Sequence, residues 1–358
     1  MVIGSLPYAV EKIDTISGER FFRAIERGSP IYDVDTLGTY VEEDLRLLAV
    51  YKPDVVVGDF RLSLDVSARL AKVPYATVTN AYWSPYAKNT YPVPELPINK
   101  LFGVRAGQML FDLFRPVVSR LHARPFNQLR TRRGLEPIEP DIRVIYTHAD
   151  YTLYADLPEL VPMNGRPANH QFLGPVLWSP SHELPHWWNE LPSDRPIAYV
   201  TPGSSGHANF LENVLEALAE AKIPAIVATA GRSLKLAPRE NVWLAEYLPG
   251  ERAAARANLV ICNGGSPTCY QALAAGVPIV GIATNLDQYL NMSLIDRAGA
   301  GILIRAGQAS AARLRCAFEQ ILGTSSYRDC ASALQQASRA HAAGKAFTSF
   351  LDGIAAHA

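Results

Sequence analysis

The sequence predicts an α/β protein built from two doubly wound, Rossmann-like domains, and three observations lead to this fold class. Short apolar runs alternate with helical patterns through the second half of the chain, as expected of a parallel sheet covered by helices on both faces. The first half repeats this alternation less regularly, and a proline-dense segment joins the halves. The length of 358 residues fits two domains of roughly 100–200 residues each. We predict a first domain over residues 1–172, a linker over 173–196 and a second domain over 197–358.

In the first domain, the apolar runs are short and widely separated. Strands are predicted at residues 54–58, 75–79 and 151–154, with a helix at 64–71. Residues 83–99 hold four prolines among tyrosines, which neither a helix nor a central strand tolerates. We expect this segment to be a long loop. Loops of this length in compact domains are often functional, here as a wall that faces the substrate.

The second domain has a regular series of strand and helix patterns. Eight prolines lie between residues 158 and 196, and such a stiff segment between two α/β halves is typical of a domain connection. An apolar helical stripe runs from Phe210 to Leu218, and the chain is expected to be helical beyond the last strand. The predicted strands are 197–201, 226–229, 242–245, 259–262, 277–282 and an edge strand at 301–304. Parallel strands of this kind place a ligand crevice at their carboxyl ends.

The composition argues against several functional classes. Lysine plus arginine equals aspartate plus glutamate, 34 against 34, so no excess charge directs the chain to nucleic acid or to an anionic membrane. The sequence has no apolar run near the roughly 18 residues of a membrane span and no secretion signal at its start, so we expect a soluble cytoplasmic protein. The four cysteines lie in predicted strands or helices without metal-ligand spacing, so we expect buried, reduced thiols.

The most informative segment is the strand-to-helix turn at residues 263–268, Asn-Gly-Gly-Ser-Pro-Thr. A strand that ends in glycines before a helix leaves backbone N–H groups aimed at one point, near the positive end of the helix dipole, and this arrangement binds phosphate. Gly264 and Gly265 let a ligand approach the backbone, while Ser266 and Thr268 add hydroxyl donors. The alternative interpretation is an ordinary βα turn with no ligand.

Taken together, these segments resemble the GT-B glycosyltransferases, in particular family 1 enzymes that glycosylate lipids and secondary metabolites. The matching pieces are the turns at 201–206 and 263–268, the Glu-Tyr-Leu-Pro-Gly segment at 246–250, and the pair Asp287 and Gln288. The resemblance covers nearly the whole chain. It implies two Rossmann-like domains that face a cleft, with a nucleotide-diphosphate sugar on the second domain and neither a metal ion nor another cofactor.

The resemblance also implies roles for individual residues. Gly264, Gly265 and Ser266 would hold the diphosphate, with Thr268 alongside, and Asp287 with Gln288 would bind hydroxyls of the donor sugar. Tyr247 would lie against the base, and Leu248 would offer it backbone hydrogen bonds. The donor-binding set is completed by Gly203, Ser204 and Ser205 in the earlier turn. Two alternatives stay open, because Tyr247 also suits a half-buried strand end and Asp287 a helix N-cap.

Asn263 departs from the family pattern, which usually has a histidine at this position. An asparagine amide can still donate a hydrogen bond to phosphate, but it cannot carry positive charge. We therefore expect donor binding to be kept, with a different strength and pH dependence.

The catalytic base is the main gap in the resemblance. Inverting transfer needs a base for the acceptor hydroxyl, which in the family is a histidine steadied by an aspartate. Asp59 matches that aspartate, but residues 1–50 contain no histidine. We expect the chain to begin inside the first domain, which would then be incomplete, and an N-terminal extension of roughly 40–70 residues to restore transfer. His207, after the turn at 201–206, is the alternative base.

The leading hypothesis is an inverting glycosyltransferase that moves a sugar from a UDP- or dTDP-sugar to a hydroxyl of a small lipophilic or aromatic acceptor. A nucleotide-sugar-binding remnant without transfer activity is the first alternative, because the donor half looks intact while the base is missing. A GT-B-like sugar-nucleotide epimerase is a third possibility, since it would share the donor turn. Fold alone does not separate these functions.

Overall fold

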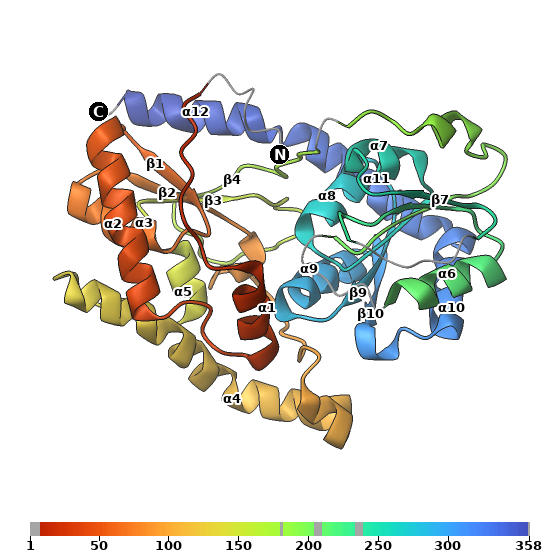
Figure 1. Ribbon diagram of the computed structural model, residues 1–358, viewed down its shortest axis with the longest axis horizontal. Helices are drawn as coiled ribbons and strands as arrows, with labels where there is room; N and C mark the ends of the chain where they lie inside the picture. Colours follow the sequence, from red (N-terminus) through yellow and green to blue (C-terminus); the bar gives the residue numbers. More distant parts are fainter. Residues whose placement is uncertain (1–7, 180–181, 204–209, 233–238, 357–358) are drawn as a thin grey trace. The chain divides into compact units, whose positions relative to one another are not determined.

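The computed structural model describes residues 8–179, 182–203, 210–232 and 239–356, and the chain divides into two compact units (Figure 1). Unit 1 comprises Met1–Lys88, Ile98–Gly174 and Ala343–Ala358, and unit 2 comprises Asn89–Pro97 and Pro175–Ala342. This division differs from the predicted domain boundaries in three segments. The predicted linker groups with the second unit from Pro175 on. Asn89–Pro97 groups with the second unit, and Ala343–Ala358 returns to the first.

The core of unit 1 is a parallel sheet with the strand order β1-β2-β3-β4. Its strands are β1 (Val56–Asp59), β2 (Tyr75–Thr79), β3 (Tyr151–Tyr154) and β4 (His170–Phe172). The first three lie where the apolar runs predicted them. The short β4 was not predicted, because only three residues pair and one of them is exposed.

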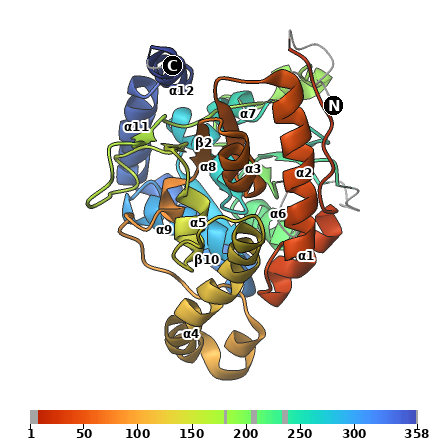
Figure 2. The same cartoon turned by 90° about the vertical axis from the view of Figure 1, so that its left-hand side faces the viewer.

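Two helices pack against this sheet, α3 (Ser63–Ala71) and α5 (Ile142–Thr147). The other helices of this part of the chain are α1 (Gly18–Arg27), α2 (Val34–Tyr51) and α4 (Pro97–Arg132), with a short 3₁₀ turn at Ala81–Trp83. Figure 2 shows α2 and α3 side by side. Leu37 of α2, Val66 of α3 and Phe126 of α4 belong to one buried cluster, so the second half of α4 helps to close this layer.

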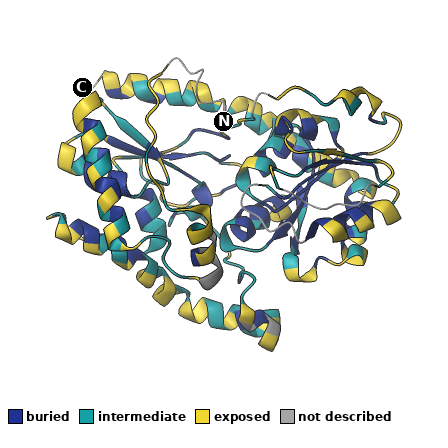
Figure 3. Cartoon of the chain, in the orientation of Figure 1, coloured by how far each residue is buried: buried dark blue, intermediate teal, exposed yellow. Residues whose placement is uncertain are grey.

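The long helix α4 was not predicted. The loop expected at residues 83–99 ends at Leu96, and α4 follows with a non-helical φ of 80° at Gly103 and two internal prolines. These breaks hid the helical pattern in the sequence, since proline and glycine normally end helices. Much of α4 is exposed, as Figure 3 shows. Among the described residues no helix, including this one of 36 residues, combines the length and apolar character that a membrane span requires.

The opposite face of the unit 1 sheet is covered by the last helix, α12 (Ala343–Ala355). Adjacent residues of β2 point to opposite faces, so Tyr75 packs with α3 while Ala76 packs with α12. Phe350 of α12 lies in that second cluster and meets the Tyr151 ring edge-on at 5.3 Å between centroids. The final helix is therefore part of the core of unit 1.

Removing the Phe350 ring should destabilise unit 1. Phe350 is 7% exposed, so we expect Phe350→Ala to lower the free energy of unfolding by about 3 kcal/mol, near the low end for a buried phenylalanine. The exposed neighbour Ser349→Ala should change it by less than about 0.5 kcal/mol. Urea unfolding followed by circular dichroism measures both variants. Equal stabilities would mean that α12 does not stabilise the sheet.

Unit 2 is a six-stranded parallel sheet with the order β10-β9-β8-β5-β6-β7. The strands are β5 (Ala198–Thr201), β6 (Ala225–Ala228), β7 (Val242–Ala245), β8 (Leu259–Cys262), β9 (Ile279–Ala283) and β10 (Gly301–Arg305). All six predicted strands are present, and β10 lies at the sheet edge as predicted. In chain order this is the 3-2-1-4-5-6 arrangement of Rossmann folds, whose switch point lies between β5 and β8.

Helices pack on both faces of the unit 2 sheet. They are α6 (Leu211–Glu220), α7 (Gly250–Arg256), α8 (Ser266–Ala274), α9 (Leu286–Arg297), α10 (Ala311–Gly323) and α11 (Ser325–Ala340), with 3₁₀ turns at His186–Glu190 and Ala306–Gln308. The four central strands β5, β6, β8 and β9 are fully buried, whereas the edge strands β7 and β10 are partly exposed (Figure 3). All four cysteines are free thiols. Cys262 and Cys269 are buried as expected, but Cys316 in α10 is exposed and Cys330 in α11 is partly exposed.

Candidate functional site

The turns after β5 and β8 meet at the switch point of the unit 2 sheet. Thr201 and Cys262 are paired in register at the ends of the two strands, so the turns that follow start side by side. A Cβ atom added at Gly203 would lie 3.0 Å from Nδ2 of Asn263, and the φ of Gly203 is +64°. The two turns are thus in contact, and Gly203 is suited to this place because it has no side chain. Ser204, Ser205 and His207 lie outside the described residues.

The turn at residues 263–265 is held by its own side chains. Asn263 is buried, and its Oδ1 accepts the N–H of Gly265 at 3.1 Å, while the N–H of Gly264 donates to Sγ of Cys262 at 3.3 Å. Gly264 has a φ of +81°, and a Cβ atom there would come within 2.6 Å of Cγ of Met292. Two of the N–H groups predicted to face phosphate therefore have internal partners in this structure. A phosphate at Gly265 would have to compete with the Asn263 side chain.

The N-terminus of α8 has the electrostatics of an anion site. Cys269 makes the first backbone bond of the helix, to the carbonyl of Gly265, so the N–H groups before it have no partner within the helix. Pro267 occupies the first turn, where the missing N–H costs little. Among the described helices α6 to α9, only α8 lacks an acidic residue in its first turn. The first turn of α8 itself therefore holds no carboxylate that would neutralise the positive end of its dipole.

Tyr247 follows β7 and lies on the turn after β6. A Cβ atom at Gly231 would come within 2.0 Å of the Tyr247 hydroxyl, so the phenol lies directly against that glycine. The ring is 47% exposed and stacks on His182 at 5.5 Å between centroids, with the planes 27° apart. Leu248 is buried beside it. The stack of Tyr247 with His182 is a feature that sequence reasoning missed, because His182 lies in the proline-rich segment with no local signal.

The predicted sugar-binding pair opens helix α9. Asn285 caps the helix by accepting the N–H of Gln288, and Oε1 of Gln288 accepts from Thr284 N at 2.9 Å, Thr284 Oγ1 at 2.9 Å and Asn285 N at 3.4 Å. Three donors converge on this atom, which identifies it as the amide oxygen. Nε2 of the buried Gln288 has no hydrogen-bond partner among the described residues. Asp287 is partly exposed in the same first turn.

Helix α9 also contacts the glycine turn, so the two predicted subsites adjoin. Asn291 is fully buried, and its Nδ2 donates to the carbonyl of Gly264 at 2.9 Å. Met292 packs against the same glycine. The structure thus brings together Asn263, Gly264 and the first turns of α8 and α9 at the carboxyl edge of the sheet.

Asp59 is the last residue of β1 in unit 1, at the carboxyl end of the strand. The residue is exposed, and desolvation of its carboxyl group by neighbouring atoms raises the pKa of Asp59. Within the described part of the chain, no hydrogen bond or ion pair to this carboxylate is found. The ring of His148 contacts a different aspartate, Asp65.

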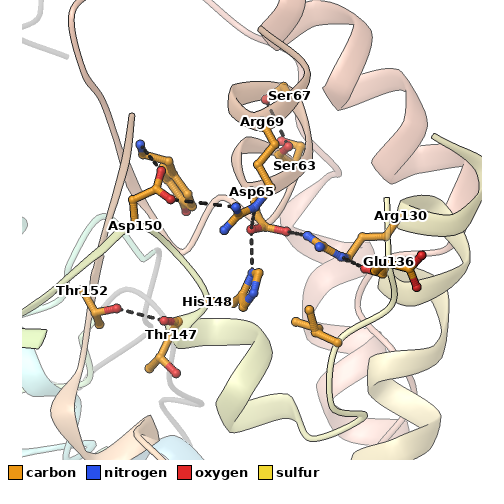
Figure 4. A network of polar contacts seen from close by, with 12 residues as sticks. Ser63, Asp65, Ser67, Arg69, Arg130, Glu136, Thr147, His148, Asp150 and Thr152 are labelled. Carbon is orange, nitrogen blue, oxygen red and sulfur yellow. Dashed lines mark hydrogen bonds and ion pairs between the residues drawn. The ribbon is translucent and has the colours of Figure 1, made fainter. Parts of the chain in front are cut away.

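Asp65 is the centre of a buried ionic network (Figure 4). Its carboxylate contacts Nδ1 of His148 at 2.7 Å, Nε of Arg69 at 3.1 Å and the guanidinium of Arg130. Burial by itself would raise the pKa of Asp65. The hydrogen bond and charge of His148, with the charges of Arg130 and Arg69, outweigh burial and hold the pKa below its usual range. The network joins α3, α4 and the segment before β3, so we interpret it as structural.

Solved glycosyltransferase structures share this architecture. The spinosyn rhamnosyltransferase SpnG, solved with spinosyn aglycone, is 19% identical and superposes with a TM-score of 0.65, covering 92% of this chain and 81% of that one. The same enzyme solved with thymidine diphosphate gives a TM-score of 0.62 at 18% identity, covering 92% and 80%. At such identities the comparison establishes the fold alone. This protein has the GT-B fold, which confirms the predicted fold class.

Relatives of higher identity define the family. The erythromycin biosynthesis protein CIII-like C-terminal domain matches residues 212–346. A PGL/p-HBAD biosynthesis rhamnosyltransferase of Mycobacterium bovis (strain BCG / Pasteur 1173P2) is 50% identical over 337 residues, which are 94% of this chain and 75% of the relative. An inactive PGL/p-HBAD biosynthesis glycosyltransferase of the same organism is 49% identical over 217 residues, 61% of this chain and 59% of the relative. The chain belongs to this family of GT-B glycosyltransferases.

Proposed function

We propose that this glycosyltransferase moves a sugar from a nucleotide-diphosphate donor to a hydroxyl of a small lipophilic or aromatic acceptor, with inversion at the sugar carbon. The observation that carries the proposal is the glycine turn at the switch point of the unit 2 sheet, followed by a helix without an acidic first turn. That combination favours an anion with the charge of a diphosphate.

The donor would be distributed over three groups of residues in unit 2. The diphosphate would lie at Gly264, Gly265, Ser266 and Thr268, with the helix dipole stabilising the charge that develops on the leaving group, so that no metal ion is required. The base would stack near Tyr247. The sugar hydroxyls would face Asp287 and the unpaired Nε2 of Gln288, since an acceptor and a donor side by side suit vicinal hydroxyls.

A dTDP-deoxysugar is the donor that the relatives favour. The M. bovis relative is named a rhamnosyltransferase, and the structural neighbour SpnG is a rhamnosyltransferase solved with thymidine diphosphate. We propose dTDP-rhamnose as the first donor to test, with UDP-sugars as the alternative. The spinosyn aglycone bound by SpnG supports a lipophilic alcohol as acceptor.

The proposed acid–base machinery rests on Asp59. Its carboxylate has no partner among the described residues, so it could orient a base and stabilise the protonated form of that base, as the resemblance implies. His207 is the alternative base, and it lies outside the described residues.

A protein that binds nucleotide sugar without transferring it is the second candidate. One relative that is 49% identical over 217 residues is named inactive, so the family includes members without transfer. No feature of the described residues favours the epimerase alternative over either of these.

One assay separates the candidates. The chain is incubated with dTDP-rhamnose, with and without a lipophilic phenol, and the products are followed by mass spectrometry. We expect glycoside and dTDP in equal amounts only when the phenol is present. Donor binding by calorimetry without turnover across an acceptor panel would support the binding protein instead. Absence of any dTDP or UDP binding would contradict the proposed donor site.

A further inference from the structure

A proline-rich strap, residues Asn89–Pro97, packs into unit 2 although both of its ends continue into unit 1. Three of its nine residues are prolines, so its extended backbone loses little conformational entropy when it docks. Val93 is fully buried. This strap is most of the segment that the sequence predicted to be a substrate-facing loop, and its contacts lie beside the start of α9.

Glu95 of the strap makes the central contacts. Its Oε1 accepts the hydroxyl of Tyr289 at 2.6 Å and lies 2.8 Å from Nη2 of Arg305. The same guanidinium donates to the Val93 carbonyl at 2.8 Å and lies over the Tyr289 ring, 4.7 Å from its centroid. Burial and then the hydrogen bond to Glu95 raise the pKa of Tyr289, so the phenol remains a neutral donor. The Glu95 carboxylate is thus held by the Arg305 cation and by the Tyr289 hydroxyl.

The space around this carboxylate is closely fitted. A Cβ atom added at Gly307 would lie 2.8 Å from Oε2 of Glu95, so a side chain there would force the carboxylate to shift. The side chains of Glu95 and Arg305 are 24% and 13% exposed, which shields their pairing from solvent.

Glu95 is connected to Gln288 along two routes. The backbone N–H of Glu95 donates to the carbonyl of Thr284 at 2.9 Å. The N–H and hydroxyl of that same Thr284 both donate to Oε1 of Gln288. The second route is the carboxylate, since Tyr289 follows Gln288 directly in α9. The strap therefore holds both the turn before the helix and the helix itself.

We propose that Glu95 is a positioning residue for the donor-sugar subsite, where it holds the 284–289 turn so that the Gln288 amide nitrogen is directed at a sugar hydroxyl. This inference rests on the proposed function, in which Asp287 and Gln288 bind the sugar. A residue of the predicted substrate-facing loop would thereby help to bind the sugar of the donor. Glu95 itself bonds to Thr284, Tyr289 and Arg305, and none of these three residues is assigned to the diphosphate.

The test compares binding of dTDP-rhamnose and of dTDP to the full chain by calorimetry. Glu95→Ala should weaken dTDP-rhamnose roughly tenfold while dTDP changes less than about twofold. Glu95→Gln keeps the shape and one acceptor oxygen, so it should restore part of the sugar affinity. Glu216→Ala, at an exposed position of α6 in the same unit, is the control and should leave both ligands unchanged. The ratio of the two affinities is the readout, because simple loss of stability would affect both ligands alike.

Asp287→Ala and Gln288→Ala separate failure of this inference from failure of the proposed function. Both should lower the affinity for dTDP-rhamnose and not that for dTDP. If they do so while Glu95→Ala leaves the ratio unchanged, the role of Glu95 is overturned and the sugar subsite stands. If neither changes the ratio, the sugar subsite itself is wrong. If Glu95→Ala does not fold, Glu95→Gln decides, and equal loss of both ligands in it also overturns the proposal.

Discussion

Gly265→Val should abolish binding of nucleotide diphosphates to a protein that remains folded. The φ and ψ of Gly265 are −68° and 142°, a conformation open to any residue, and an added Cβ atom would meet only the Asn263 side chain, at 3.2 Å. We therefore expect the protein to fold with valine after a small shift of the Asn263 side chain, while the valine methyl groups would fill the position that a phosphate needs against the backbone. We expect affinity for dTDP or UDP to fall by more than about 100-fold, or about 3 kcal/mol.

Two further glycine variants give this experiment its controls. Gly265→Ala adds one methyl group and should produce an intermediate loss of affinity. Gly264→Ala should instead destabilise the fold, because the φ of +81° disfavours a side chain and its Cβ would lie 2.6 Å from Cγ of Met292. Calorimetry with dTDP and UDP, combined with thermal unfolding, distinguishes the two effects. Unchanged affinity in a folded Gly265→Val variant would contradict the assignment of this turn to the diphosphate.

Asp65→Asn should be the most destabilising of the substitutions considered in unit 1. It leaves the buried Arg130 without its carboxylate, and breaking a buried ion pair in this way costs about 3–5 kcal/mol. Asp35→Asn removes a carboxylate that pairs with Arg132 but is 85% exposed, so that control should change stability by less than about 1 kcal/mol. Urea unfolding at neutral pH measures both. A small effect of Asp65→Asn would show that solvent replaces the lost contacts.

The same network predicts how stability depends on pH. The pKa of Asp65 is lower in the folded protein than in the unfolded chain, so its stabilisation is complete above the unfolded pKa, about 3.9, and is lost as the pH falls through the folded pKa. The wild-type chain should therefore lose stability on acidification below about pH 4 more steeply than Asp65→Asn. Parallel acid dependence in the two proteins would contradict the lowered pKa.

The glycine turn illustrates what local sequence could predict about the candidate site. The apolar run before residue 263 and the helical pattern after it identified a strand-to-helix turn, because hydrophobic period and turn residues are local properties. The internal partners of the turn could not be predicted. The sulfur of Cys262 and the side chain of Asn263 occupy its N–H groups, which depends on side-chain conformations that residue identity does not specify.

Contacts between residues that are distant in the sequence could not be predicted from sequence patterns. Glu95 lies 194 positions before Tyr289, and nothing local marks the two as partners. The Asp65 network likewise joins residues from three separate segments. Helix α4 was missed for a different reason, because its internal prolines and Gly103 resemble the signals of a loop.

By itself, the sequence determined the alternation of strands and helices, the two-domain α/β class and the position of the glycine turn, since each follows from periodicity and backbone preference within a short window. Only the tertiary structure decided that the strap Asn89–Pro97 packs with unit 2 and that α12 closes the sheet of unit 1. It also decided that the amide oxygen of Gln288 accepts hydrogen bonds at the start of α9, while its amide nitrogen has no hydrogen-bond partner among the described residues. Those outcomes depend on which buried surfaces and polar groups come into contact between segments that are distant in the sequence. Such contacts form only in the folded protein.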